Sequence, residues 1–253
     1  MISIGAKPHA ISVIRWGESA SFFDLGWVMD ISLGELKKFG IIRMEGNVVM
    51  GLIQSNTNPG PAWQIAELFP DQGDSSESDY LFLTERTNRL VEFNEGQIEV
   101  LPMPTKAHQR IVRYLIGLLM SFAGSRGEVL FAPLRVRLRN GKFREPDVVF
   151  MLAEHANRIG NQFWEGAHLV MEIVSEDDPE RDLHTKRQEY ADAGIPEYWI
   201  VDPRSQTITV LTLRDGQYIC HSESIGTGSV QSALLQPFSV DAASVFASAR
   251  GNA

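Results

Sequence analysis

The sequence contains very little cysteine, a single residue at position 220 in a chain of 253. One cysteine excludes an intrachain disulfide framework and any zinc cluster built on several thiolates. No apolar run approaches the roughly eighteen residues that a membrane-spanning helix needs. Residues 1–16 do not combine a basic segment with a following apolar core, so no secretory signal is expected. These absences together predict a cytoplasmic protein without a membrane span.

An excess of positive charge is also lacking. The chain has 32 Asp and Glu against 23 Lys and Arg, a net charge of −9, which argues against a protein that coats nucleic acid. The charge is unevenly distributed, however. Residues 110–144 carry eight basic residues and one acid, whereas residues 145–182 carry ten acids and two arginines. This division suits a metal-dependent enzyme that acts on a polyanion, although chance clustering of surface charges would give the same counts.

The chain predicts an N-terminal extension, residues 1–60, followed by one mixed α/β domain, residues 61–250. The turn-rich segment "SNTNPGP" at 55–61 separates the two parts, and residues 1–49 are expected to have no independent fold. In the domain, residues 89–104 predict a β-hairpin, and residues 105–124 have the apolar spacing of a helix capped by Thr105. Further strands and two more helices indicate a central mixed sheet flanked by helices.

Two carboxylates stand out in this pattern. Asp147 follows Pro146 and opens an apolar strand, and Glu172 is the charged residue within the apolar stretch "LVMEIV". A buried charge is costly unless it is paired or binds a metal. If the two strands are neighbours in the sheet, both carboxylates can converge and bind one cation. Oxygen ligands without cysteine favour Mg²⁺ or Mn²⁺ over zinc.

A lysine in the next predicted helix could complete this site. Leu183, Lys186 and Tyr190 have the spacing of one helical stripe, and the outer two are residues expected to face the sheet. An inward lysine needs a negative partner, which Asp147 and Glu172 would provide. Spacing alone supports equally well a lysine that extends outward along its aliphatic stem.

These segments carry a resemblance to a known family. The stretches "EPDVVFM", "LVMEIVS" and "RDLHTKRQEYADAGIPEYWIVDP" resemble the Uma family of restriction endonucleases, a branch of the PD-(D/E)xK nuclease superfamily. The likeness runs from about Pro61 to about Ala247 and implies a restriction-endonuclease-like core preceded by a β-hairpin. The superfamily triplet reads Glu172-Ile173-Val174 here, with valine in the lysine position. In this branch the following helix supplies the lysine, and Lys186 occupies that place, which favours the inward orientation.

The resemblance implies Mg²⁺-dependent hydrolysis of phosphodiester bonds in DNA, with RNA as an open alternative, by a homodimer. Asp147 and Glu172 would bind the metal. Lys186 would orient or deprotonate the attacking water, or neutralise charge on phosphorus. Glu92 matches a family glutamate that would complete the acidic site, although an exposed hairpin carboxylate explains it as well.

Four further residues are expected to bind nucleic acid. Arg135, Arg137 and Arg139 alternate with apolar residues and so share one strand face, which would contact the phosphate backbone. His108 matches a family position and would be a helix cap or a phosphate contact. Two other functions fit the same residues: a catalytically inactive nucleic-acid-binding or interaction module on a nuclease fold, and a metal-dependent hydrolase of another phosphoester.

Overall fold

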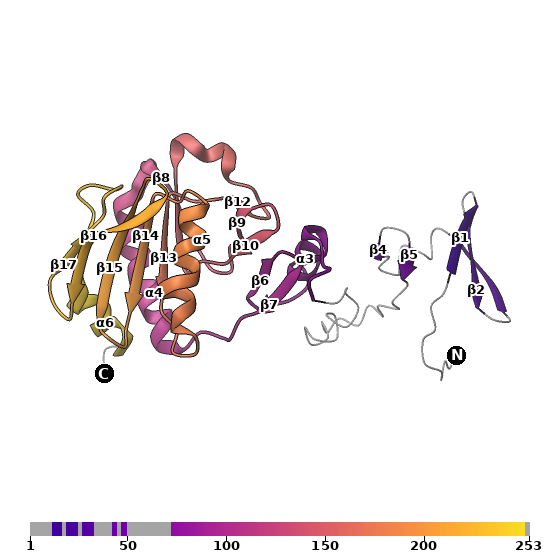
Figure 1. Ribbon diagram of the computed structural model, residues 1–253, viewed down its shortest axis with the longest axis horizontal. Helices are drawn as coiled ribbons and strands as arrows, with labels where there is room; N and C mark the ends of the chain where they lie inside the picture. The colour runs from indigo at the N-terminus through magenta and orange to yellow at the C-terminus, as the bar shows by residue number, and fades with distance from the viewer. Residues whose placement is uncertain are drawn as a thin grey trace. The chain divides into compact units, whose positions relative to one another are not determined.

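The computed structural model describes backbone and side chains for residues 72–250 and, before them, the backbone of five short strands (Figure 1). The chain divides into two units, Met1–Leu68 and Phe69–Ala253. The predicted boundary at residue 60 lies outside the described residues, as does most of 1–49. The two-part organisation and the lack of an independent fold in 1–49 therefore stay predictions.

The first unit contains two small antiparallel sheets. One has three strands in sequential order, and the other is a two-stranded pair. Their strands are β1 (Ser12–Trp16), β2 (Ser19–Asp24), β3 (Trp27–Ser32), β4 (Ile42–Met44) and β5 (Asn47–Val49).

The second unit is built on a six-stranded mixed sheet with the order β16-β15-β14-β13-β11-β8. The pair β13–β14 is parallel, and the other neighbours are antiparallel. The strands are β8 (Gly127–Phe131), β11 (Val148–Leu152), β13 (Leu169–Ile173), β14 (Glu197–Asp202), β15 (Thr207–Arg214) and β16 (Gln217–Ile225). The predicted mixed α/β class is confirmed.

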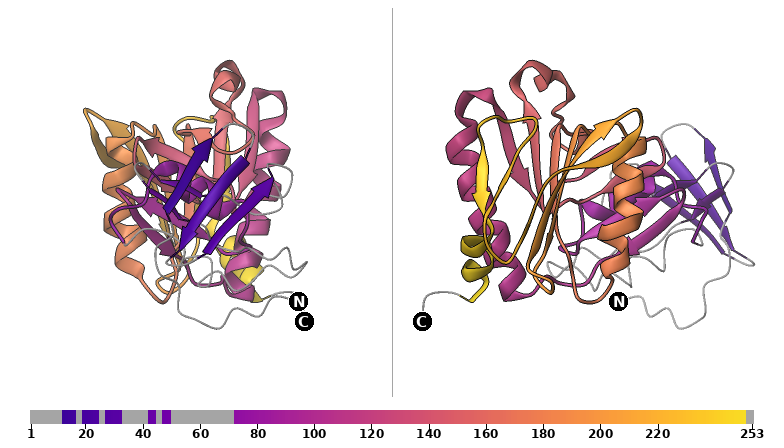
Figure 2. Two further views of the ribbon diagram at one scale, coloured as in Figure 1. Left: turned by 90° about the vertical axis from the view of Figure 1, so that its right-hand side faces the viewer. Right: turned by 60° about the vertical axis from the view of Figure 1, so that its left-hand side comes forward.

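Helices cover both faces of this sheet, as the right-hand view of Figure 2 shows. On one face, α4 (Lys106–Ala123) and α6 (Ala242–Arg250) pack on the alternate β13 residues Leu169, Met171 and Ile173. Beside them, β17 (Ser229–Gln231) pairs with β18 (Ser239–Asp241).

The opposite face is covered by α5 (Lys186–Asp192), and its core contains Val170, Val174 and Tyr190. Side chains alternate along a strand, so Glu172 points to the same face as Val170 and Val174, toward α5. The local pattern of β13 therefore decides which helix the buried glutamate meets.

A second sheet, not predicted from the sequence, lies beside the first with the order β12-β9-β10-β6-β7. Pro133 and Pro146 flank the segment that contains β9 and β10, and proline has no backbone N–H to continue a ladder. The chain therefore leaves the large sheet after β8 and returns to it with β11. The strands are β6 (Val91–Asn94), β7 (Gln97–Val100), β9 (Val136–Arg139), β10 (Lys142–Arg144) and β12 (Trp164–Glu165).

One aromatic cluster holds the second sheet together. Tyr80 of α3 (Glu77–Thr84) is fully buried, with its ring 5.3 Å from Phe93 and 5.1 Å from Phe143. Its hydroxyl donates a hydrogen bond to the Val91 carbonyl at 2.8 Å. Such aromatic contacts add to the burial energy. They fix α3 on the hairpin β6–β7.

The predicted local signals of the hairpin and of α4 are confirmed. Glu95 and Gly96 both adopt positive φ, 49° and 87°, as a tight two-residue turn requires. The Thr105 hydroxyl accepts a hydrogen bond from the His108 backbone N–H, and Gly124 ends α4 with φ 52°. His108 is thereby placed in the first turn of α4.

The helix expected after Glu172 is present, but its first part differs from an α-helix. Residues Arg181–Thr185 form a π-helical turn, η3, before α5 begins at Lys186. The described residues also contain two short 3₁₀ segments, η1 (Gly124–Arg126) and η2 (Ala153–Arg158). Within residues 72–250, no helix combines the length and apolarity needed to cross a bilayer.

Candidate active site

The two predicted carboxylates meet through the register of β11 and β13. These strands are antiparallel with Val148 opposite Met171, so the next pair outward is Asp147 opposite Glu172. The Ile173 backbone N–H donates a hydrogen bond to Asp147 Oδ2 at 2.8 Å, which fixes the aspartate at this end of the sheet. The structure thus brings together the two residues expected to bind a metal.

The Lys186 side chain points inward, which is one of the two orientations that the spacing of the sequence left open. Its Nζ lies 3.0 Å from Glu172 Oε2 and 2.9 Å from Asp182 Oδ1. All three side chains are buried. The lysine is therefore shared between two carboxylates, one from β13 and one from the π-helical turn.

Two further side chains contact the predicted residues: Asp182, for which the sequence left open a supporting role in the site or a capping role, and Tyr190, which the sequence indicated only as a sheet-facing residue. Asp182 precedes Lys186 by four residues, but an acidic residue near the start of a helix is equally typical of helix-end stabilisation. The Tyr190 hydroxyl donates a hydrogen bond to Glu172 Oε1. The Tyr198 hydroxyl donates to the Asp182 backbone carbonyl at 2.8 Å, which anchors the π-helical turn on the sheet.

Burial and mutual repulsion dominate the electrostatics of this group. Burial raises the pKa of Glu172, the Lys186 ammonium opposes this effect, and the charges of Asp147 and Asp182 add to it. Burial also disfavours the ammonium of Lys186, but Glu172 and Asp182 outweigh burial and raise the pKa of Lys186. The site therefore gathers three carboxyl groups around one lysine, and an added cation would reduce the cost of ionising them together.

His108 contacts the same aspartate from the first turn of α4. Its Nε2 lies 3.1 Å from Asp147 Oδ2, and its Nδ1 is buried without a hydrogen-bond partner among residues 72–250. Burial lowers the pKa of His108, but the hydrogen bond and charge of Asp147 outweigh it and raise the pKa. The structure thus joins His108 to the predicted metal-binding pair.

Glu92 is not an exposed hairpin carboxylate, because it is fully buried beneath the site. Arg144 Nη1 donates to Glu92 Oε2 at 3.0 Å, Arg181 also pairs with Glu92, and the Glu145 backbone N–H donates to Oε1 at 3.1 Å. Burial raises the pKa of Glu92, but Lys186, Arg144 and Arg181 outweigh it and lower the pKa. Glu92 therefore interacts electrostatically with Lys186 through this cluster.

The same cluster ties the second sheet to α5. Arg144 of β10 is buried and donates two hydrogen bonds to Glu189 of α5, at 2.7 and 2.8 Å. Lys142 Nζ contacts Glu189 as well, at 2.7 Å. Ion pairs thus connect β10 with the helix that carries Lys186.

The three arginines of the predicted phosphate-binding face have different partners. Arg137 pairs with Glu165 and Glu77, and Arg139 pairs with Glu95. The Arg135 Nη1 instead donates to the neutral hydroxyl of Thr84. The three residues follow one stretch of chain, but two of the three guanidinium groups are already neutralised by carboxylates.

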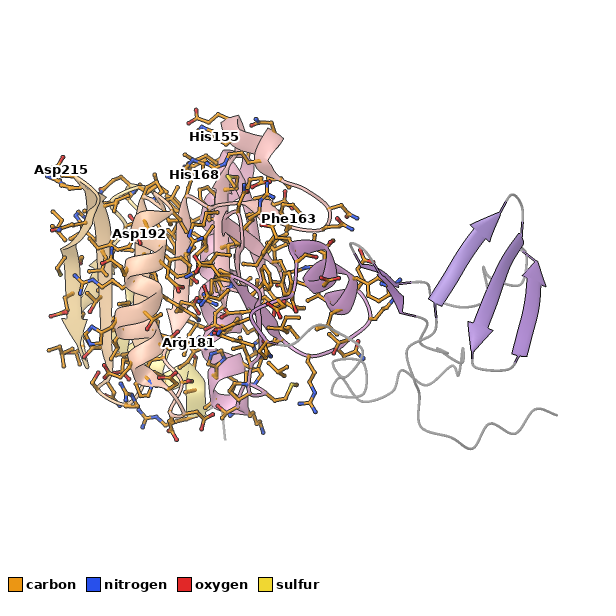
Figure 3. The ribbon with its side chains drawn as sticks, turned by 45° about the vertical axis from the view of Figure 1, so that its right-hand side comes forward. His155, Phe163, His168, Arg181, Asp192 and Asp215 are labelled. Atoms are coloured by element: carbon orange, nitrogen blue, oxygen red, sulfur yellow. The ribbon has the colours of Figure 1, made fainter. Side chains whose placement is uncertain are left out.

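The carboxylates line a cleft of about 620 Å³ in the second unit. Figure 3 places Arg181, one of its residues, at the opposite end of the domain from His155 and His168. Besides Arg181, the lining includes Glu145, Arg204 and the acidic loop residues Glu176, Asp177 and Asp178, together with Asp147, Glu172, His108, Asp182 and Lys186. Of the predicted site residues, four therefore line one cavity (Asp147, Glu172, Lys186 and His108), whereas Glu92 and the three arginines do not.

The donor set fits Mg²⁺ or Mn²⁺ better than a fully protein-coordinated metal. The Ile173 N–H and His108 Nε2 both contact Oδ2 of Asp147, so Oδ1 is the oxygen left to face a cation. Residues 72–250 contain no group of three or more His, Cys, Asp or Glu arranged to hold a metal. Two carboxylates completed by water and substrate oxygens are the usual Mg²⁺ environment, whereas zinc sites need more protein ligands.

Replacing Arg144 by methionine is expected to destabilise the fold by about 3–5 kcal/mol, because Glu92 and Glu189 would stay buried without their shared cation. The free energy of unfolding in urea would measure this. Arg139→Met is the matched control, since the Arg139 partner Glu95 lies on the surface. Equal loss of stability in both variants would contradict the structural role of the Arg144 cluster.

Glu189 is expected to make stability depend on pH below its ordinary pKa of 4.5. Burial opposes its charge, but Arg144 and Lys142 outweigh burial and lower the pKa in the folded state. The stabilisation is then complete above about pH 4.5 and disappears as the pH falls through the lower, folded value. The urea midpoint of Glu189→Gln should lie below that of the unsubstituted protein at pH 7 and converge with it in acid.

Glu128→Gln, a change at an exposed carboxylate, serves as the control and should leave the midpoint unchanged at every pH. A difference between Glu189→Gln and the unsubstituted protein that stays constant down to about pH 3 would argue against a lowered pKa of Glu189.

Comparison with known proteins adds two findings. The family Uma2, described as "Putative restriction endonuclease", matches residues 78–242, more than half of the chain. A crystal structure from Anabaena variabilis, described as a putative nuclease belonging to DUF820, superposes with a TM-score of 0.53 at 16% identity, covering 67% of this chain and 98% of that one. That likeness confirms the restriction-endonuclease-like core predicted from the sequence. No curated protein sequence matches the chain.

Proposed function

The chain belongs to the Uma2 family of restriction endonucleases, and we propose that it is a Mg²⁺-dependent endonuclease that hydrolyses phosphodiester bonds of DNA. The observation that carries this proposal is the convergence of Asp147, Glu172 and Lys186 at one cleft. Mn²⁺ would serve in place of Mg²⁺. The homodimer and the cytoplasmic location stay predictions from the sequence.

In this proposal, Asp147 and Glu172 hold the cation. A divalent cation bound there would supply a water of lowered pKa and would stabilise charge on the departing oxygen. The Ile173 N–H keeps Asp147 in place through Oδ2, and the Tyr190 hydroxyl does the same for Glu172 through Oε1. Carboxylates held in this way need little rearrangement when the substrate enters.

Lys186 acts on the substrate phosphate in this mechanism. Its ammonium lies 3.0 Å from Glu172, and so it is positioned beside the proposed metal ligand. From there it neutralises negative charge that develops on the non-bridging oxygens, and it orients the attacking water. Asp182 positions the lysine from the other side at 2.9 Å. Glu92 is proposed to support this arrangement through its electrostatic effect on Lys186.

His108 and Arg135 are proposed to bind the phosphate backbone. His108 lines the cleft next to Asp147, where an imidazole N–H can donate to a phosphate oxygen. Of the three predicted arginines, Arg135 would give an affinity that falls with salt and carries no base specificity, because carboxylates already neutralise Arg137 and Arg139.

Asp147→Asn should abolish Mg²⁺-dependent cleavage of plasmid DNA, because the amide removes the charge that holds the cation. The fold should persist, since the amide oxygen still accepts from Ile173. Asp215→Asn, a change in the turn between β15 and β16 far from the cleft (Figure 3), is the matched control and should cleave normally. Binding of DNA without cleavage by the unsubstituted protein in Mg²⁺ and Mn²⁺ would contradict an enzymatic function.

Lys186→Met should lower the cleavage rate by about 100-fold or more, because the developing charge on phosphorus loses a cation. The single-turnover rate at saturating DNA measures this step separately from binding. Because Lys186 is buried against two carboxylates, the thermal midpoint of the variant must be measured first. A folded Lys186→Met protein with an unchanged single-turnover rate would remove Lys186 from the mechanism.

A further inference from the structure

A second hollow, of about 450 Å³, adjoins the cleft on the other side of Asp147. We call it the Arg135 groove. It shares with the cleft the lining residues Leu90, Met103, Pro104, Glu145 and Asp147. A polymer bound with one linkage at Asp147 therefore has two directions in which to continue, along the cleft or into the Arg135 groove.

The two directions differ in charge. Beyond the shared residues, the Arg135 groove is lined by two arginines, Arg135 and Arg89, and by neutral polar side chains such as Thr84 and Gln109. The cleft on its own side also has two arginines, but carboxylates neutralise both, since Arg181 pairs with Glu92 and Glu99 and Arg204 pairs with Asp202. The loop acids Glu176, Asp177 and Asp178 add negative charge there. A phosphate chain is repelled by the acidic loop and attracted by the guanidinium groups.

Arg135 is also the best prepared of the three predicted arginines for an anionic ligand. Arg137 and Arg139 must break contacts with carboxylates before either can bind phosphate. The contact of Arg135 is to a hydroxyl, which orients the guanidinium without neutralising its charge. Glu145, a groove acid that interacts electrostatically with Arg135, is itself engaged by a hydrogen bond from the Val91 N–H.

We infer that the Arg135 groove binds the sugar–phosphate backbone of the substrate strand next to the linkage at Asp147, with Arg135 and Arg89 as its phosphate contacts. This inference rests on the proposed function and deepens it. It assigns the salt-dependent part of binding to these two residues and removes Arg139 from the phosphate-binding face.

The test is binding of a fluorescein-labelled DNA oligonucleotide to the full chain in EDTA, which prevents metal-dependent turnover. Affinity is measured between about 50 and 200 mM salt, where each lost phosphate contact lowers the slope of log K against log salt by about 0.7–0.9. Arg135→Gln should show this loss, and Arg135→Lys, which keeps the charge, should retain the slope. Arg139→Gln is the matched control on the same strand and should behave as the unsubstituted protein.

Arg89→Gln gives a second measurement at an exposed position where folding is not at risk, and it should lower the slope by the same amount. Unchanged slopes in both groove variants would overturn the inference, as would an equal loss in Arg139→Gln. If either of these results is found but the unsubstituted protein still cleaves DNA in Mg²⁺, the proposed function stands and only the assignment of the groove fails. If the unsubstituted protein neither binds nor cleaves DNA, the proposed function itself has failed.

Discussion

One buried ammonium group determines how the candidate site is arranged. Lys186 Nζ lies between Glu172 and Asp182, and all three side chains are buried. Carboxylates placed this close repel one another, and a buried carboxylate without a cation is strongly destabilising. The position of the lysine therefore depends on the strand that carries Glu172 and on the π-helical turn that carries Asp182.

A second group of charges connects this centre to the smaller sheet. Arg144 pairs with both Glu92 of the hairpin and Glu189 of α5, and Arg181 pairs with Glu92. Hydrogen-bonded ion pairs fix direction and distance more narrowly than apolar contacts do. These ion pairs thus fix the distance between the hairpin β6–β7 and α5, the helix that carries Lys186. The cleft lies between elements that do not belong to one common hydrophobic core.

Local features of the sequence predicted the elements well. The positive-φ turn at Glu95-Gly96, the Thr105 cap and the inward-facing Glu172 each follow from residue types within one element. The meeting of Asp147 with Glu172 required only that their strands be neighbours. These parts of the fold and of the site depend on short-range physics, and a single sequence contains that information.

The second sheet and several partners of the site residues could not be predicted, because they depend on contacts between segments that lie far apart in the sequence. The second sheet forms because β10 pairs not only with its sequence neighbour β9 but also with β6, nearly fifty residues earlier. Asp182 and Lys186 are four residues apart and so share one helical face, but their spacing alone does not show that this face turns toward Glu172. The partners of Arg137 and Arg139 lie on α3, β12 and the hairpin turn, so strand alternation placed their side chains without revealing their neutralisation. Whether the arranged residues catalyse hydrolysis stays a prediction.

The order in which the site is assembled follows from its register and connections. Glu172 and Lys186 belong to one strand–helix–strand unit, β13–α5–β14, and only fourteen residues separate them. Closing so short a loop loses little chain entropy, whereas joining Glu92 to Arg144 closes a loop of fifty-two residues. During synthesis on the ribosome, Lys186 is the last of the predicted site residues to be added to the chain. The predicted set is therefore complete before β14, the parallel partner of β13, has been made, and its lysine lies in the connection between these two strands.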